Sequence, residues 1–154
     1  SKPGFRFIAL SQRRANDEVS ETEVISAAPD NSVIQFAQGN DATIVCFGYT
    51  LVHGKSLISA IRDLGHTASL FTVNYVRDAN WSIAVLEASK NKKLVIIDDT
   101  RGPTSLAFRF LADVLEFDKN VVFTIVRNRE DLSTTVSDEK FDFKGEEVVA
   151  QVFG

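Results

Sequence analysis

The residues of this sequence that could do chemistry include a glycine-lysine-serine triplet at 54–56. It follows Gly48 and an apolar run, an order that resembles the phosphate-binding loop of nucleotide hydrolases. Residues 49–53 separate the two glycines, which is one residue more than that loop has, and most of them are bulky. A phosphate-binding loop needs a backbone free to turn its N–H groups toward one anion. Apolar residues also recur at helical spacing on both sides of Gly54, so we predict that Gly54 lies within a helix and that the chain does not hydrolyse nucleotides.

An acidic pair is the second candidate. Asp98 and Asp99 follow the apolar run 94–97. Carboxylates at the carboxyl end of a parallel strand lie where open α/β sheets bind ligands, which makes this pair the best local candidate for a polar site. Acid-base catalysis would also require a raised pKa, which a sequence does not show. We favour a structural interpretation, in which the pair closes the strand and caps the next segment, and Asp99 pairs with Arg101 at the surface.

One cysteine and two histidines complete the reactive side chains. Cys46 lies in the middle of an apolar run, which predicts a buried, inert thiol. His53 lies near the start of a predicted helix, where it can reach across an interface or lie half-buried, and His66 in the turn after Gly65 is expected to face solvent. None of these residues lies at metal-ligand spacing. We therefore predict no catalytic, cofactor-binding or metal-binding residue in this chain.

The elements that position these residues follow one repeated pattern. Apolar runs at 43–47, 69–73 and 94–97 are short, rich in β-branched or aromatic residues, and each precedes a helix-length segment. Consecutive apolar positions suit strands that are covered on both faces. Alternating strands and helices predict right-handed crossovers and a parallel sheet. We expect an α/β fold, a three-layer α/β/α sandwich with a mostly parallel sheet.

The helices and remaining strands follow from the same pattern. We predict helices at 50–64, after Asp78 as the N-cap, and at 105–115. A fourth strand is predicted at 121–126, and residues 148–153 are predicted to form a last edge strand or to reach a neighbour. The residues expected to be buried are Trp81, Ile83, Ala84 and Leu86 in the second helix and Leu106, Phe110, Leu111 and Val114 in the third.

The beginning of the chain differs from the rest. Residues 11–32 are polar and lack a sustained helical period, and they lie between apolar segments at 5–10 and 33–36 that each predict a short strand. We predict a leader or connector at 1–40 and a compact α/β domain at 41–154. Because the sequence contains no methionine, we expect it to be a fragment or a processed form of a longer protein.

Composition excludes several classes of protein. The chain has 154 residues, of which 44% are hydrophobic and 25% charged, enough for one substantial core. Its net charge of -4 and the lack of a basic stripe argue against nucleic-acid binding. No apolar run approaches the roughly 20 residues that span a bilayer, and no signal-peptide pattern is present. We expect a cytoplasmic protein, or one of the mitochondrial matrix or plastid in a eukaryote.

Several segments resemble a known family. The order ATIVCFGYTLVH, then ISAIRDLGHTASLFTVNYVRD, then IAVLEASKNKKLVIIDD resembles the carboxyl-terminal domain of the transketolase family. It is most similar to the version in the beta subunit of thiamine-diphosphate-dependent 2-oxoacid dehydrogenases, such as pyruvate dehydrogenase. The matching residues are Gly48, Val52-His53, Leu64-Gly65 and residues 92–97, within a resemblance that covers about residues 33–126. Asn74 stands where the family usually has arginine, and Asp98-Asp99 stand where a glutamate pair is common.

The resemblance implies a supporting role. In this family the thiamine diphosphate, its magnesium and the activating glutamate belong to other domains, while this domain holds subunits together and helps dock the acyltransferase core. The chain would thus be the assembly domain of a decarboxylating enzyme, inactive alone, and would associate with itself or with a partner subunit. The polar residues expected at such an interface are His53, Asn74, Arg77, Asp98, Asp99 and Arg101.

Two alternatives stay open at this point. The first is the equivalent domain of transketolase itself, of deoxyxylulose-phosphate synthase or of a 2-oxoacid ferredoxin oxidoreductase. The second is a free-standing receiver or ligand-binding domain of flavodoxin-like build, with Asp98 or Asp99 as its polar focus. A receiver normally carries its acidic pair after its first strand, whereas this pair follows the third core strand, which disfavours the second alternative.

Overall fold

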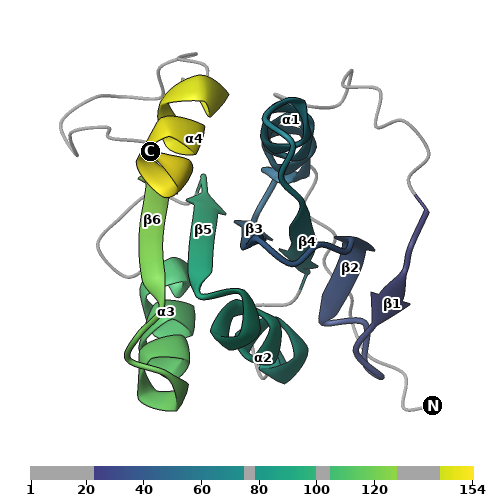
Figure 1. The fold of residues 1–154 in the computed structure, drawn as a ribbon. Coiled ribbons are helices and arrows are strands. Elements are labelled where there is room, and N and C mark those ends of the chain that lie inside the picture. Colours follow the sequence, from purple (N-terminus) through teal and green to yellow (C-terminus); the bar gives the residue numbers. More distant parts are fainter. Residues whose placement is uncertain (1–22, 75–78, 100–104, 128–142) are drawn as a thin grey trace, which may run out of the picture.

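The structure is a computed structural model that describes residues 23–74, 79–99, 105–127 and 143–154. These residues form one six-stranded sheet with helices on both faces (Figure 1). The strands are β1 (Ser26–Ala27), β2 (Val33–Ala37), β3 (Ala42–Phe47), β4 (Ala68–Val73), β5 (Lys93–Asp98) and β6 (Val122–Arg127). The helices are α1 (Leu51–Asp63), α2 (Ser82–Asn91), α3 (Leu106–Phe117) and α4 (Gly145–Phe153).

The sheet is mostly parallel, as predicted. Its strand order is β1-β2-β4-β3-β5-β6. Strand β3 runs parallel to both β4 and β5, and β6 runs parallel to β5. Strand β2 pairs antiparallel with β4, and β1 pairs antiparallel with β2. The antiparallel strands therefore form one edge of the sheet and β6 forms the other (Figure 1).

The core lies on both faces of the central strands. All residues of β3 and β4 are buried, and successive side chains of a strand point to opposite faces. Val45 and Phe47 join a cluster with side chains of α2 and α3, while Ile44 and Cys46 join one with side chains of α1 and α4. Helices α2 and α3 thus cover one face and α1 and α4 the other (Figure 1). This confirms the three-layer α/β/α sandwich.

Most predicted elements are confirmed. The runs at 43–47, 69–73, 94–97 and 121–126 form β3, β4, β5 and β6, and the predicted helices at 50–64 and 105–115 form α1 and α3. The helix expected after Asp78 is α2, which begins at Ser82, and Asp78 itself lies outside the described residues. Asn80 Oδ1 accepts hydrogen bonds from the Ser82 N–H at 3.3 Å and the Ser82 hydroxyl at 2.7 Å. Asn80 is therefore the residue whose side chain binds the first residue of α2.

The predicted strand at 148–153 is wrong, because this segment belongs to α4. Its valines and phenylalanine have high strand propensity, which explains the wrong prediction. Val148 and Val149 are buried against the cluster under α1, and Val152 packs partly against it, which is one face of a helix. Glu146 and Glu147 occupy the first turn of α4, where negative charge stabilises a helix. No helix among the described residues is long and apolar enough to cross a membrane.

The expected leader is partly integrated into the sheet. The strand predicted at 33–36 is β2, and it pairs with β4 from Val33 onward. The sheet therefore begins before residue 41, where the sequence predicts the start of the compact domain. The apolar segment 5–10 lies outside the described residues, so a leader before β1 stays a prediction.

Helix α1 approaches the sheet most closely at Gly54. The Gly54 N–H donates to the Thr50 carbonyl oxygen at 3.0 Å, which confirms that this glycine is helical and not part of a phosphate-binding loop. A Cβ atom at Gly54 would lie 2.6 Å from Cys46 Sγ and 2.7 Å from Leu70 Cδ1. Protein interiors are packed too densely to absorb such overlap without movement. Glycine is thus what lets α1 lie against β3 and β4.

Gly54→Ala should lower the free energy of unfolding by up to about 2 kcal/mol, measured by urea denaturation. Alanine favours a helix over glycine by about 1 kcal/mol, but overpacking of a core costs roughly 1–3 kcal/mol. Ser59→Ala, at an exposed position of the same helix, is the matched control and should leave stability unchanged or slightly raised. If Gly54→Ala raised the free energy of unfolding as much as Ser59→Ala does, the close approach of α1 to the sheet at residue 54 would be contradicted.

Asp118 joins the ends of α2 and α3. Its Oδ2 accepts hydrogen bonds from the Lys92 ammonium and, at 2.9 Å, from the Ser89 hydroxyl, while its Oδ1 accepts the Asn120 N–H at 3.0 Å. Lys92, just after α2, has a left-handed backbone with φ of 61°. The hydrogen bond from Lys92, followed by those from Asn120 and Ser89, holds the pKa of Asp118 well below its usual value of 3.8.

This lowered pKa predicts a loss of stability in acid. Because the folded pKa lies below the unfolded one, the contribution of Asp118 is complete above the unfolded pKa and disappears as pH falls through the folded value. Urea denaturation should show a stability difference between the wild type and Asp118→Asn that is constant above about pH 5 and shrinks below about pH 4. Lys92→Gln should weaken the pH dependence of stability, since the hydrogen bond from Lys92 is the largest cause of the lowered Asp118 pKa. A stability difference between the wild type and Asp118→Asn that grows as pH falls would contradict the lowered pKa.

Candidate functional site

The carboxyl ends of the parallel strands bring the sequence candidates to one edge of the sheet. Asp98 ends β5, Asp99 follows it, and Phe47, at the end of the neighbouring β3, is the register partner of Asp98. Asn74 follows β4 directly. Arg127 ends β6 and is the register partner of Asp98 on the other side. Open α/β sheets bind ligands at this edge, so the contacts of each polar group decide what the edge can hold.

Asp98 is fully buried and holds the start of α3. The Ser105 hydroxyl donates a hydrogen bond to Asp98 Oδ2. The same Ser105 oxygen accepts the Ala107 N–H at 3.1 Å and thereby caps α3. Since a hydroxyl can donate one hydrogen bond and accept others, Asp98 orients the capping oxygen toward the helix. The structural interpretation of this carboxylate is supported by its geometry.

Asp99 holds the turn between β3 and α1. Its Oδ2 accepts the Tyr49 N–H at 3.2 Å. Gly48 has a φ of +68°, and a Cβ atom there would lie 2.0 Å from Asp99 Oδ1, so both the backbone and the carboxylate require glycine. The Thr50 hydroxyl lies 3.0 Å from the carbonyl oxygens of Phe47 and Ile97 and links the same two strand ends.

Both carboxylates of the described edge bind groups of the chain itself. Anions bind at helix starts through free backbone N–H groups, and the Tyr49 N–H, which lies just before the N-cap Thr50 of α1, binds the Asp99 carboxylate. Two carboxylates at this edge would also repel a phosphate. Within the described ranges, no group of three or more His, Cys, Asp or Glu residues is placed to hold a metal ion.

Cys46 is buried in the sheet, as predicted. Burial raises the pKa of its thiol to about 12, so the reactive thiolate is not populated at neutral pH. The side chain lies beneath Gly54 of α1, and only 1% of the residue is exposed. The expectation of an inert thiol is thus supported by its surroundings.

The remaining interface candidates make contacts within the chain. The His53 ring lies 5.0 Å from the ring of Phe143, just before α4. The backbone N–H of Asn74 donates to the Ser32 carbonyl oxygen at 2.8 Å. The side-chain amide of Asn74 donates to the backbone carbonyl oxygen of Asn31 at 3.3 Å. Asn74 therefore ties β4 to the turn before β2. Arg77 and Arg101 lie outside the described residues, and the interface role of all six candidates stays a prediction.

His66 does not face solvent, contrary to the sequence expectation. It is half-buried, and its ring stacks on that of Phe153 with 4.5 Å between the ring centroids and 17° between the planes. The Lys93 ammonium lies 4.5 Å from the same Phe153 ring. The end of α4 is therefore held by aromatic and cation–π contacts. The sequence analysis did not find these contacts, because it predicted a strand in place of α4.

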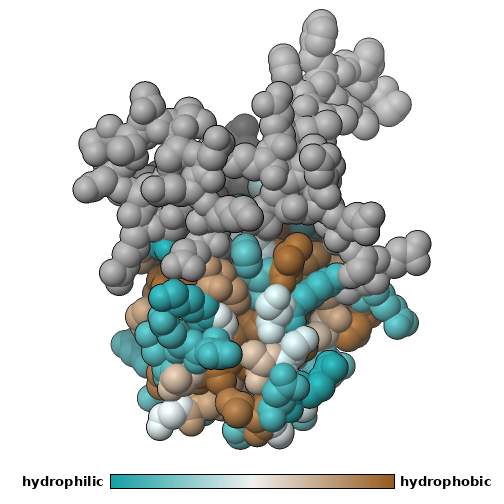
Figure 2. All heavy atoms as spheres, turned by 90° about the horizontal axis from the view of Figure 1, so that it is seen from above, coloured by the Kyte–Doolittle hydropathy of each residue, from teal (hydrophilic) through white to brown (hydrophobic). Residues whose placement is uncertain are grey.

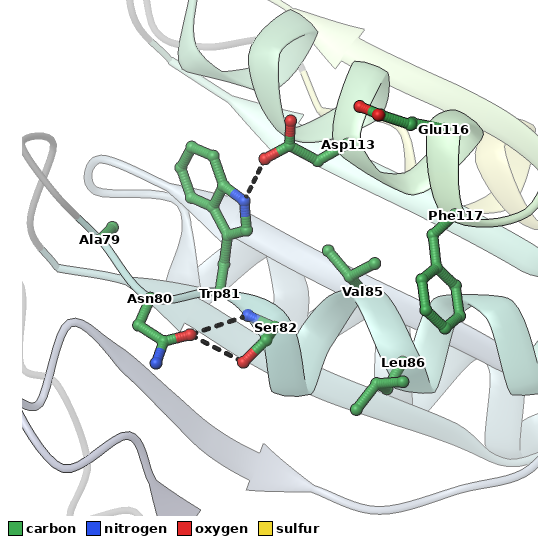
Figure 3. A pocket seen from close by; sticks show the side chains of 9 residues that line it. All are labelled: Ala79, Asn80, Trp81, Ser82, Val85, Leu86, Asp113, Glu116 and Phe117. Atoms are coloured by element: carbon green, nitrogen blue, oxygen red, sulfur yellow. Dashed lines mark hydrogen bonds between the residues drawn. The ribbon is translucent and has the colours of Figure 1, made fainter.

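A groove between α2 and α3 is not predicted by the sequence (Figure 3). It has a volume of about 680 Å³, and its walls include the apolar side chains of Trp81, Val85, Leu86 and Phe117. The Trp81 indole N–H donates to Asp113 Oδ2 at 2.7 Å. Leu86 is expected from the sequence to be buried but is 55% exposed, because Val85 and Ala88 take the buried face of α2. The sequence analysis could not find this groove, because it assigned Leu86 to the buried face of its helix.

Comparison with known proteins supports the fold. No protein-family model matches the chain, and no curated protein matches it. Among solved structures, the chain is similar to a split-gene transketolase described as an inactive β4 tetramer. The TM-score is 0.63 at 18% sequence identity, and the match covers 78% of this chain and 39% of that one. At this identity the likeness establishes a shared fold, over less than half of the length of the transketolase chain.

The contact between Asp98 and Ser105 should appear as an energetic coupling. We expect Ser105→Ala to lower the free energy of unfolding by about 1–3 kcal/mol, because it removes a helix cap and a partner of a buried carboxylate. In a double-mutant cycle with Asp98→Asn, the combined loss should be at least about 0.5 kcal/mol smaller than the sum. Asp98→Asn with Ser89→Ala, which contacts Asp118, is the control and should be additive. If Asp98→Asn and Ser105→Ala were additive, the structural role assigned to the contact between Asp98 and Ser105 would be contradicted.

Proposed function

We propose that this chain is the carboxyl-terminal assembly domain of a thiamine-diphosphate-dependent enzyme, of the type found in the beta subunit of 2-oxoacid dehydrogenases. Its task is association between subunits, and the chemistry belongs to other domains. The observation that carries the proposal is the fold shared with part of a split-gene transketolase. The sequence resemblance to the 2-oxoacid dehydrogenase branch supports the narrower assignment.

The residues of that resemblance occupy turns of the fold. Gly48 forms the left-handed turn after β3, and Gly65, with a φ of +81°, ends the turn after α1. Lys92 forms the left-handed turn between α2 and β5. At each of these positions the backbone is left-handed, a conformation that constrains the residue type. They support a domain of the family type, while transketolase, deoxyxylulose-phosphate synthase and 2-oxoacid ferredoxin oxidoreductase are the alternative branches.

The polar contacts support the proposed division of labour. Asp98 and Asp99 bind Ser105 and the Tyr49 N–H within the chain, so their hydrogen bonds serve the fold. Thiamine diphosphate and magnesium, which the parent enzyme would use, would accordingly be held elsewhere. The solved relative is an inactive tetramer of its β chain, and by analogy we propose that this chain is inactive alone and associates with itself, with a partner subunit or with an acyltransferase core.

A receiver-like function is less consistent with the geometry. Such a domain requires an acidic residue that a ligand or a phosphoryl donor can reach. Asp98 is buried beneath the start of α3, and Asp99 binds the backbone at the start of α1. Both carboxylates would have to leave these partners before they could react.

Analytical ultracentrifugation tests the proposal. Sedimentation velocity over a range of micromolar concentrations should show self-association or, with a partner subunit added, a stable complex. Calorimetric titration with thiamine diphosphate and magnesium should release no specific heat, because under this proposal other domains hold the cofactor and both described carboxylates bind groups of the chain. A chain that is monomeric under both conditions, or one that binds the cofactor tightly, would contradict the proposal.

A further inference from the structure

We propose that two copies of this chain associate through the outer edge of β6, with the two β6 strands paired antiparallel about a two-fold axis. The partner is a second copy of the chain, and the two sheets become one continuous sheet. The inference gives a surface and a partner to the assembly role and in that respect rests on the proposed function. The support comes from the backbone, the side chains and the flanking helix of this edge.

The outer backbone groups of β6 are directed away from the sheet. The Val122 N–H donates to the Lys92 carbonyl oxygen at 2.8 Å, so the backbone of residue 122 points toward β5. In a parallel ladder alternate residues bond to the same neighbour, and the backbone groups of Phe123 and Ile125 therefore point outward. Strand β6 ends the strand order, and no strand of the described residues pairs with this side. A row of such groups is a template for another strand.

The two edges of the sheet differ in how they are protected. Edge strands are commonly shortened, bulged, charged or interrupted by proline, which prevents pairing with other chains. At the opposite edge β1 has only 2 residues, and the pairing of β2 shifts register between Gln35 and Ala37. Strand β6 has 6 residues, no proline and no charge before Arg127, and its pairing with β5 is regular. Of these two edges, β6 is therefore the one suited to strand pairing.

The side chains of β6 are complementary to those of a second β6. Phe123 and Ile125 share the face of Leu94 and Ile96, their register partners, which lie in the cluster under α2 and α3. A two-fold axis through Thr124 keeps that face on one side and places Phe123 opposite Ile125 of the other copy. It also places Val122 opposite Val126 of the other copy and Thr124 opposite itself. Aromatic–β-branched, β-branched and Thr–Thr pairs stabilise antiparallel strands, and no like charges meet.

Helix α3 supplies an apolar flank beside the edge. Phe108, Ala112 and Leu115 lie at helical spacing on one side of α3. The Arg127 guanidinium lies 5.0 Å from the Phe108 ring, which places this side of α3 against β6. Phe108 is 46% exposed, Phe123 44% and Val122 68%. The same axis would bring two antiparallel α3 helices together with the small Ala112 near their midpoint and would cover Phe108 and Phe123. Val122, on the other face of the sheet, would be covered by Val126 of the other copy.

Disulfide trapping of the full chain tests the register. Thr124→Cys lies on the axis in a pair without hydrogen bonds, where the Cα atoms of antiparallel strands are about 4.5 Å apart and a disulfide can form. Mild oxidation should convert it largely to a covalent dimer on non-reducing gels, while the buried Cys46 does not react. Val122→Cys is the matched control. It is more exposed but lies off the axis, so it should crosslink only when mixed with Val126→Cys.

A charge variant tests the energetics of the same surface. Phe123→Lys should raise the dissociation constant of the dimer at least about tenfold in sedimentation velocity. Leu64→Lys, which adds the same charge at a 58% exposed apolar residue of the α1 end, should leave it unchanged. Trapping in the Thr124→Cys chain does not depend on whether Phe123→Lys folds.

The outcomes separate this inference from the proposed function. Trapping of Thr124→Cys and of the mixed pair, without trapping of Val122→Cys alone, would support the β6 dimer. A chain that self-associates but is not trapped through residue 124 would overturn the β6 dimer and leave the assembly role intact. A heterologous complex lost in Phe123→Lys, with no homodimer, would overturn the second copy as the partner. A chain that neither self-associates nor binds a subunit would overturn both.

Discussion

Burial of the central strands on both faces is the constraint on which the rest of this structure depends. Every residue of β3 and β4 is buried, so helices have to cover both sides of the sheet. Burying one large apolar side chain contributes about 1.5–3 kcal/mol, and this sum is what outweighs the entropy of ordering the chain. The close approach of α1 at Gly54 and the two separate clusters follow from it. On the face seen in Figure 2, the described residues mix hydrophilic and hydrophobic side chains.

The contacts of the polar residues at the strand ends follow from the way this core is built. Parallel strands end at one edge, and the chain must turn there into helices whose first N–H groups need partners. Asp98 acts through Ser105 at the start of α3, and Asp99 binds the Tyr49 N–H at the start of α1. The edge at which open α/β sheets bind ligands thus carries, in the described residues, contacts that join strands to helices. Among the described strands, β6 ends the sheet, and we propose that its outer edge serves assembly.

The sequence predicts what depends on continuous apolar runs and fails where tertiary contacts decide. The runs around Cys46 and Ile96 identify their strands because both faces are apolar. The segment at 148–153 is predicted as a strand because valine favours strands locally, and only packing against the α1 cluster makes it a helix. The sequence predicts the wrong exposure for His66, because its ring stacks on Phe153 of α4, and for Leu86, because Val85 and Ala88 take the buried face of α2. It identifies the acidic pair as structural but not its partners, because Ser105 and Tyr49 meet the pair only in three dimensions.

Amide hydrogen exchange at two protein concentrations tests this account most directly. Amides of β3, β4 and β5 should exchange most slowly, and equally at both concentrations, because they open only with the whole core. The outward amides of Phe123 and Ile125 should become more protected as concentration rises. Concentration-dependent protection confined to the carboxyl edge around Asp98, with β6 unaffected, would contradict the assignment of that edge to the fold and of β6 to assembly.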